Sequence, residues 1–260
     1  MSQRFFLSQP IVDGFATLEG DEAHHLVRVM RARSGYKCTL FDGTGSEYRA
    51  EVAEILPKRV RLWILDRQVV DRELPFRITI GAPLPKGDRE RFLVEKLTEL
   101  GVTVFVPLVT ARGVVRPTAA AVRRLERAVI EASKQCGRNR LMQIAAPTAL
   151  PSFLRDHATA EVRWLAHPGD SRRETTAAGH TPDASNSPPG RGGSDVAPGE
   201  SLLVPRPDAA RAAAVGPEGG FTPEELQAAA SLGWRCVDLG PRVLRVETAA
   251  IALAVKLTSH

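Results

Sequence analysis

The chain of 260 residues contains few cysteines and few aromatic residues, and it has no long apolar run. Its three cysteines, Cys38, Cys136 and Cys236, are widely spaced and form no C-x-x-C motif, which favours a reducing cytoplasm over a disulfide framework. No apolar stretch reaches the roughly 18 residues that a membrane-spanning helix needs, and the polar start is unlike a signal peptide. We therefore expect a cytoplasmic protein with no membrane association.

Common ligand-binding signatures are missing as well. No G-x-G-x-x-G pattern occurs, so the dinucleotide fingerprint is absent, and no G-x-x-x-x-G-K-[ST] pattern indicates a phosphate-binding loop. The tandem histidines His24 and His25 have no cluster of cysteines or carboxylates beside them, so we predict no metal site. Basic residues outnumber acidic ones by 35 to 30, giving a net charge of +5, which favours an acidic partner such as nucleic acid.

Two glycine-containing loops are the most informative features that are present. The first follows an apolar run at 212–215 and reads GPEGGFTPEE over 216–225; its glycines permit positive φ and close approach of a ligand. Thr222, Pro223 and Glu225 predict a helix that starts with a capping box. The second reads LGPRVLRVETA over 239–249 and predicts a last helix from about Glu247. Two such loops in one α/β domain form a concave ligand site.

Together these loops resemble the cofactor loops of the SPOUT methyltransferases. More narrowly, they are similar to the bacterial small-subunit ribosomal RNA methyltransferase E family, which methylates N3 of a uridine. Four further segments resemble the same family: RFF at 4–6, HHLVRVMR at 24–31, KLTELGV at 96–102 and EASKQCGR at 131–138. The chain departs from the family at Lys134, where Glu is usual, and at 141–142, where Pro is expected nearby. Residues 169–200 match nothing in the family.

The order of patterns along the chain predicts two domains. Residues 1–72 read as mainly β, with a hairpin signal at 42–45 between two strand-like runs, and the resemblance implies a PUA-like β-barrel that binds RNA. From 73 to 260, strands and helices alternate, which indicates an α/β domain with a mostly parallel sheet. Within it, 169–200 lacks Leu, Ile and Phe, so we expect a disordered insertion.

The resemblance implies a SPOUT-type trefoil knot, with S-adenosylmethionine bound inside it, and a homodimer. It also implies a substrate, 16S ribosomal RNA or the assembled small subunit. Backbone groups and an apolar slot would hold the adenine-bearing cofactor, whereas the leucines could equally be core residues. The predicted cofactor-binding residues are Leu165, His167, Gly216, Glu218, Gly219, Gly220, Leu239, Gly240 and Leu244.

Methylation at N3 requires loss of the N3 proton and stabilisation of the anionic base. Arg245 is the candidate for stabilising that anion, although it could instead grip phosphate. Glu247 is the candidate proton acceptor, although an acidic residue in the first turn of a helix is favourable anyway. The basic residues predicted to contact RNA are Arg4, Arg28, Arg31, Lys86, Arg89 and Arg138.

Two other functions fit parts of the sequence. A non-catalytic RNA-binding protein with a degenerate knot domain would keep the basic N-terminal part, but the intact glycines and the R-x-E-T-A element argue against degeneration. A nucleotide-dependent α/β enzyme unrelated to methylation is disfavoured by the missing phosphate-binding motifs.

Overall fold

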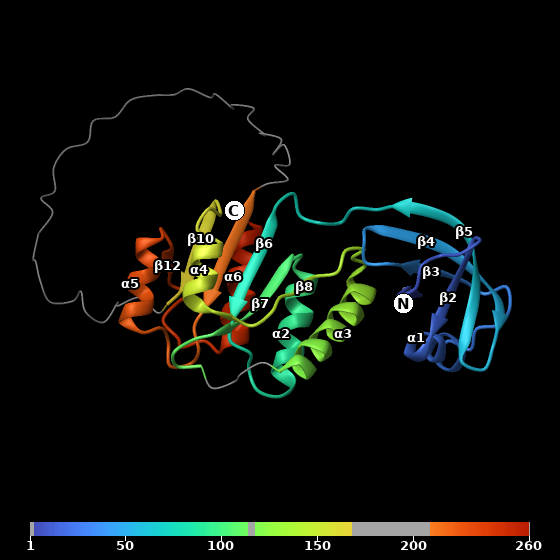
Figure 1. Ribbon diagram of the computed structural model, residues 1–260, viewed down its shortest axis with the longest axis horizontal. Helices are drawn as coiled ribbons and strands as arrows, with labels where there is room; N and C mark the ends of the chain where they lie inside the picture. Colours follow the sequence, from blue (N-terminus) through green and yellow to red (C-terminus); the bar gives the residue numbers. More distant parts are fainter. Residues whose placement is uncertain (1–2, 114–117, 168–208, 260) are drawn as a thin grey trace, which may run out of the picture.

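The computed structural model describes residues 3–113, 118–167 and 209–259. The insertion that the sequence predicts at 169–200 lies outside these described residues. Two separate β-sheets dominate the molecule, one at each end in Figure 1. Residues 4–69 supply the first sheet, and residues from Arg77 onward supply the second.

The N-terminal sheet has five strands in the order β1-β3-β4-β5-β2. The predicted hairpin is confirmed, because β3 and β4 pair antiparallel on either side of 42–45. A short helix and a π-helical turn follow β2 and cover one side of a core that includes Leu26, Leu40 and Leu62. The elements are β1 (Arg4–Phe6), β2 (Phe15–Glu19), α1 (Gly20–His24), η1 (His25–Val29), β3 (Lys37–Phe41), β4 (Ser46–Ile55) and β5 (Arg59–Val69).

The second sheet is parallel in all pairings among the described residues, in the order β12-β10-β11-β6-β7-β8, with β9 also paired to β7. Its central strands are apolar on both faces, as expected for a sheet that helices cover on both sides. The strands are β6 (Arg77–Ala82), β7 (Val104–Val109), β8 (Gln143–Ile144), β9 (Thr148–Ala149), β10 (Val162–Ala166), β11 (Ala210–Val215) and β12 (Arg235–Val237).

Helices cover the two faces of this sheet unequally (Figure 1). On one face, α2, α3 and α6 pack over Ile78, Ile80 and Ala213; on the other, α4 and α5 pack over Leu108, Leu165 and Ala214. Successive residues of β11 therefore serve opposite cores, as the alternation of side chains along a strand requires. The helices are α2 (Asp88–Glu99), α3 (Ala119–Cys136), α4 (Leu150–Asp156), α5 (Pro223–Ser231) and α6 (Val246–Thr258).

The helix boundaries follow from local sequence. Thr222 accepts a hydrogen bond from the Glu225 amide, and the Glu225 side chain accepts one from the Thr222 amide, so the predicted capping box is confirmed. Gly137 terminates α3 in the left-handed conformation at φ 85°. Strand β12 ends at Val237, because the Asp238 carboxylate accepts from the Gly240 amide and turns the chain.

The expected α/β class is confirmed, with a mostly parallel sheet preceded by a small N-terminal β part. The trefoil knot expected for the C-terminal segment stays a prediction. Among the described residues, no helix is long and apolar enough to cross a membrane.

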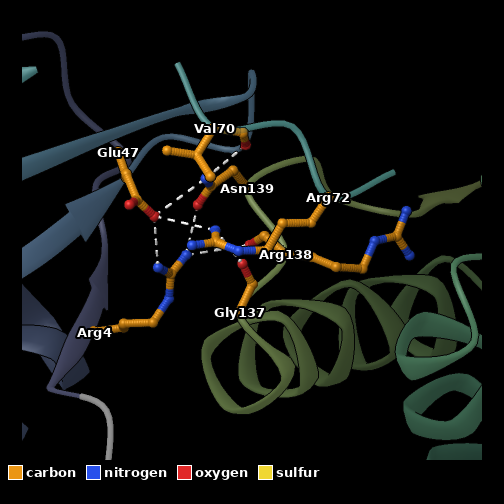
Figure 2. Close-up of polar contacts among 7 residues, drawn as sticks. All are labelled: Arg4, Glu47, Val70, Arg72, Gly137, Arg138 and Asn139. Carbon is orange, nitrogen blue, oxygen red and sulfur yellow. Dashed lines mark hydrogen bonds and ion pairs between the residues drawn. The ribbon is translucent and has the colours of Figure 1, made fainter. Parts of the chain in front are cut away.

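A polar seam joins the two sheets, and Figure 2 shows its centre. The Arg4 guanidinium donates to the Glu47 carboxylate (2.9 Å) and to the Asn139 side-chain oxygen (2.6 Å). Glu47 also accepts from Arg72 and from the Asn139 side-chain amide. Three parts of the chain therefore meet here: the N-terminal sheet, the connection around Arg72, and the end of α3.

Arg138 joins the segment between β5 and β6 to the second sheet. Its guanidinium is buried, pairs with Glu73, and donates to the carbonyl oxygens of Thr98 and Val102 at the end of α2. A separate contact lies nearby, where the Lys134 ammonium pairs with Glu22 of α1 (2.9 Å) and lies over the Phe5 ring. Burial alone would lower the pKa of Lys134, but the bond and the charge of Glu22 raise it overall. This residue, at which the chain departs from the family pattern, thus joins α3 to the N-terminal sheet.

Candidate cofactor pocket and substrate-facing residues

Three loops meet at the carboxyl edge of the parallel sheet, after the adjacent strands β10, β11 and β12. They enclose a pocket whose walls are Ala166 and His167 from the first loop, 216–218 and Gly220 from the second, and 237–240 and 242–244 from the third. Ala249, in the first turns of α6, contributes to the same wall. Ligands in open α/β sheets bind outside the carboxyl ends of the strands, so this is the candidate ligand site.

The glycines of the pocket have different roles. Gly220 has φ 68° and Gly240 has φ 107°, and a Cβ at either position would point into open space. Gly216 lines the pocket, but a Cβ there would meet the Phe221 ring at 3.1 Å. Gly219 does not line the pocket and does not have a positive φ, so its prediction as a cofactor contact is not supported by the geometry. Its carbonyl accepts from the Arg112 guanidinium instead.

The first loop supplies a buried polar atom that has no partner. The His167 amide donates to the Val237 carbonyl (3.2 Å), which fixes the residue against β12. Its ring nitrogen Nδ1 is buried without a hydrogen-bond partner within the described structure. A buried polar group is normally satisfied, so this atom marks a place where a ligand or water would bond. Leu165, also predicted to contact the cofactor, is fully buried under α4 and α5; alternation along β10 directs its side chain into the core, so the geometry does not support a side-chain contact with the cofactor.

The remaining predicted pocket residues, Glu218, Leu239 and Leu244, do line the pocket. The sequence interpretation missed several others: Pro217, Asp238, Arg242 and Val243. These residues lie within or directly beside the two glycine-containing loops, and that position in the sequence was the available signal. Arg242 gives the pocket an exposed positive charge at its rim.

Arg245 and Glu247 lie beside this pocket, at the start of α6. Arg245 is the exposed N-cap residue, and its own side chain makes no capping bond. Glu247 is buried; its Oε1 lies 3.5 Å from the Arg89 guanidinium, and its Oε2 has no partner among the described residues. Neither residue forms part of the pocket wall itself. The structure thus brings Arg89, predicted only as an RNA contact, against a predicted catalytic carboxylate.

The predicted RNA contacts divide into exposed and buried residues. Arg31 and Lys86 are exposed, and Arg28 lines a wide hollow beside α1 together with Lys58 and Arg59. Arg4 and Arg138 are 6% and 5% exposed and belong to the seam (Figure 2). The two Nη atoms of Arg4 and the guanidinium of Arg138 donate to protein acceptors, so the geometry does not support the prediction that these two contact RNA.

The described residues contain no group of three or more His, Cys, Asp or Glu side chains that could hold a metal ion. The His25 ring lies 5.6 Å from the Phe5 ring, centroid to centroid, and His24 lines the hollow beside α1.

Comparison with known proteins matches the two parts of the chain to two families. An RNA methyltransferase domain matches residues 72–258, and an RNA methyltransferase PUA domain matches 18–64. The chain is 32% identical to the ribosomal RNA small subunit methyltransferase E of Synechocystis over 247 residues, covering 95% of this chain and 74% of that one.

Two solved structures are similar over nearly their whole length. A methyltransferase from Legionella pneumophila, solved with its bound cofactor S-adenosylmethionine, has a TM-score of 0.79 at 28% identity, with 100% of this chain and 98% of that chain covered. The ribosomal RNA small subunit methyltransferase E of Neisseria gonorrhoeae, bound to S-adenosylmethionine, has a TM-score of 0.76 at 28% identity, with the same coverage.

Proposed function

This chain belongs to the ribosomal RNA small subunit methyltransferase E family, and we propose that it transfers a methyl group from S-adenosylmethionine to N3 of a uridine in 16S ribosomal RNA. The observation that carries this proposal is the three-loop pocket at the carboxyl edge of the sheet. Membership of the family supplies the reaction class and the cofactor, whereas the methylated atom, N3 of a uridine, is our proposal. The non-catalytic alternative is disfavoured because the pocket is intact.

The pocket suits S-adenosylmethionine in three respects. The glycine backbone at Gly220 and Gly240 leaves open space beside the chain, where an adenosine can approach backbone donors and acceptors. Leu239 and Leu244 supply apolar wall, and Nδ1 of His167 is a buried polar atom without a partner among residues 3–113, 118–167 and 209–259. These residues, with Gly216 and Glu218, would hold the cofactor, which supplies a methyl group on its sulfonium.

The residues at the start of α6 would manage the charge on the uracil. As the N3–CH₃ bond forms and the sulfonium–CH₃ bond breaks, the N3 proton must leave. Glu247 would accept this proton at its unpartnered Oε2, with Arg89 holding Oε1. Arg245, exposed at the N-cap, would stabilise the negative charge that develops on a uracil carbonyl oxygen.

The exposed basic residues would hold the RNA backbone. Arg28 and Arg31 lie on the N-terminal part and Lys86 on the loop after β6; Arg89 is half-buried beside Glu247. We propose residues 1–72 as an RNA-binding domain and 73–260 as the methyltransferase domain, with 16S ribosomal RNA or the assembled small subunit in the cytoplasm as substrate.

We further propose that the protein is a homodimer. Helix α6 packs against α2, β6 and β11, yet Val255 on it is 45% exposed and Val243 at the pocket rim is 82% exposed. Apolar surface next to a binding pocket is commonly covered by a partner, and a two-fold copy would cover it. Light scattering at micromolar concentration is expected to give twice the chain mass; the mass of one chain would refute the dimer.

Two measurements test the activity. Calorimetry with S-adenosylmethionine, S-adenosylhomocysteine and ATP is expected to show binding of the first two and none of the third. Nucleoside analysis of 16S ribosomal RNA, incubated with the protein and S-adenosylmethionine, is expected to show 3-methyluridine at one position. Binding of ATP alone would favour the unrelated nucleotide-dependent enzyme, and RNA binding without methyl transfer would favour the non-catalytic alternative.

A further inference from the structure

The pocket loop between β11 and α5 is tethered from outside the pocket by the loop that follows β7. The described part of the loop after β7 runs from Thr110 to Gly113, and strand β6 lies between β7 and β11 in the sheet. Two contacts reach across, over sequence separations of 107 and 114 residues. No sequence motif pairs these segments, and none of the predicted functional residues lies in the β7 loop.

The first tether is a charge-assisted hydrogen bond. The Arg112 guanidinium donates through Nη1 to the Gly219 carbonyl at 2.6 Å. Gly216, Pro217, Glu218 and Gly220 line the pocket, whereas Gly219 does not. The residue that Arg112 grips is therefore the one that turns away from the ligand space. A Cβ at Gly219 would lie 3.4 Å from Cδ of Arg112, so the arginine stem also packs on the loop.

The second tether uses the carboxylate of Glu225. Its Oε1 accepts from the Ala111 amide (3.1 Å), while its Oε2 accepts from the Thr222 amide (2.8 Å). One side chain thus closes the capping box of α5 and binds the neighbouring loop. Together the two contacts hold the pocket loop near its middle, at Gly219, and at its far end, at Thr222.

A loop of this kind needs external support. The glycines at 216, 219 and 220 leave its backbone with high conformational entropy, and its internal support in the structure includes the Gly220 amide bond to the Pro217 carbonyl (2.8 Å). Ordering the loop on binding would subtract from affinity for the cofactor. A contact that orders it beforehand removes that cost.

We infer that Arg112 is a positioning residue of the S-adenosylmethionine site, which preorganises the pocket loop from its outer side with Glu225 as a second tether. This inference rests on the proposed function, because it takes S-adenosylmethionine as the ligand of the pocket. Arg112 itself does not line the pocket and holds the loop through Gly219.

Calorimetry on Arg112→Ala tests the inference. The Kd for S-adenosylmethionine is expected to rise about tenfold, which corresponds to about 1.4 kcal/mol. The KM for the cofactor should rise in parallel, while kcat at saturating cofactor stays within about threefold. Because Arg112 is exposed, the melting temperature without ligand should change by less than about 2 °C. Arg112→Lys, which offers one flexible ammonium, should recover part of the affinity.

Arg155→Ala is the matched control, because Arg155 is also exposed and makes one side-chain bond, to Ser152 on α4, away from the pocket. It should leave the Kd unchanged. A second readout is hydrogen exchange in a peptide spanning 216–222, which should exchange faster in Arg112→Ala without cofactor and recover protection with it.

The outcomes separate the inference from the proposed function. If the wild-type protein binds no S-adenosylmethionine, the proposed function fails. If the wild type binds and Arg112→Ala binds equally well with unchanged exchange, the positioning role is wrong. Loss of RNA affinity alone in that variant would identify Arg112 as a phosphate contact and would also overturn the inference.

Discussion

The seam between the sheets and the pocket at the carboxyl edge are both rich in polar groups, but they differ in how those groups are satisfied. At the seam, Glu47 accepts from three side chains, and Arg138 donates to a carboxylate and to two carbonyl oxygens. Beside the pocket, Nδ1 of His167 and Oε2 of Glu247 are buried without partners in the part of the chain that the structure describes. Nε of Arg4, at the seam, also lacks a partner among the described residues, but the same guanidinium forms an ion pair with Glu47.

Whether a buried polar group has partners distinguishes groups that stabilise the fold from groups that bind a ligand. A buried charge is retained for structure only when its partners compensate for its desolvation, and the seam meets this condition. A buried polar atom left open in a pocket is instead a place for a ligand. Arginine alone is therefore a poor indicator of RNA binding in this chain: Arg4 and Arg138 hold sheets together, whereas Arg245 lies exposed beside the pocket.

Removing Arg138 should have the largest effect. Arg138→Ala leaves Glu73 and the carbonyls of Thr98 and Val102 without their donor, and loss of one partner from a buried ion pair costs about 3–5 kcal/mol. Urea unfolding should show this as a lower midpoint. Arg138→Lys, with a single ammonium, should lose part of that stability, and the exposed Arg127→Ala should lose almost none. An Arg138→Ala variant as stable as the wild type would show that the seam is not structural.

Removing Arg245 should act on the reaction instead. If Arg245 stabilises the uracil anion, Arg245→Ala should lower kcat by roughly 10²–10³, because a lost preorganised charge costs that much in rate. Stability and affinity for S-adenosylmethionine should remain near wild type. Arg235→Ala, exposed on β12, is the control.

A different result for the Arg245→Ala variant would change the role that we assign to Arg245. Reduced RNA affinity with a salt dependence flatter by about one unit of slope would make it a phosphate contact. Wild-type turnover would remove it from both roles.

Substituting single glycines of the pocket loop should have a smaller effect. Gly220→Ala places a side chain at φ 68°, and the left-handed conformation costs roughly 1–2 kcal/mol for an L-residue. The space around the new Cβ is open, so the cost is in the backbone, and affinity for S-adenosylmethionine should fall about tenfold. Gly219→Ala is the matched control, because Gly219 has no positive φ. Equal losses for the two variants would contradict this assignment.

Local sequence was sufficient for part of this architecture. The capping box at Thr222 and Glu225, the hairpin at 42–45 and the alternation of strands with helices depend on neighbours in the chain, and all were predicted. Two of the three pocket loops were predicted from glycines that follow apolar strands, whereas the third, at His167, was predicted only from the family resemblance.

The features that could not be predicted from the sequence depend on contacts between distant segments. Arg4 and Asn139 are 135 residues apart, and Arg112 reaches Gly219 across an intervening strand; periodicity carries no information on such pairs. The side-chain direction of Leu165 could not be predicted for a different reason: a resemblance locates a strand end, but which residue faces the pocket depends on the side on which each side chain emerges.

The smallest expected effect is a pH dependence of the seam. Burial alone would raise the pKa of Glu47, but hydrogen bonds from Arg4, Asn139 and Arg72 lower it overall below its ordinary value of 4.5. A carboxyl whose pKa is lowered by folding stabilises the folded state above its ordinary pKa, and that stability is lost as the pH falls through the folded value. Urea midpoints of the wild type and Glu47→Gln should therefore differ most near pH 7 and converge as the pH falls below 4.5 and through the lowered folded pKa. Glu126→Gln, at an exposed carboxyl on α3, should follow the wild type throughout. Parallel curves for the wild type and Glu47→Gln would show that the charge of Glu47 does not support the seam, and that the hydrogen-bonding geometry alone, which glutamine preserves in part, holds the two sheets together.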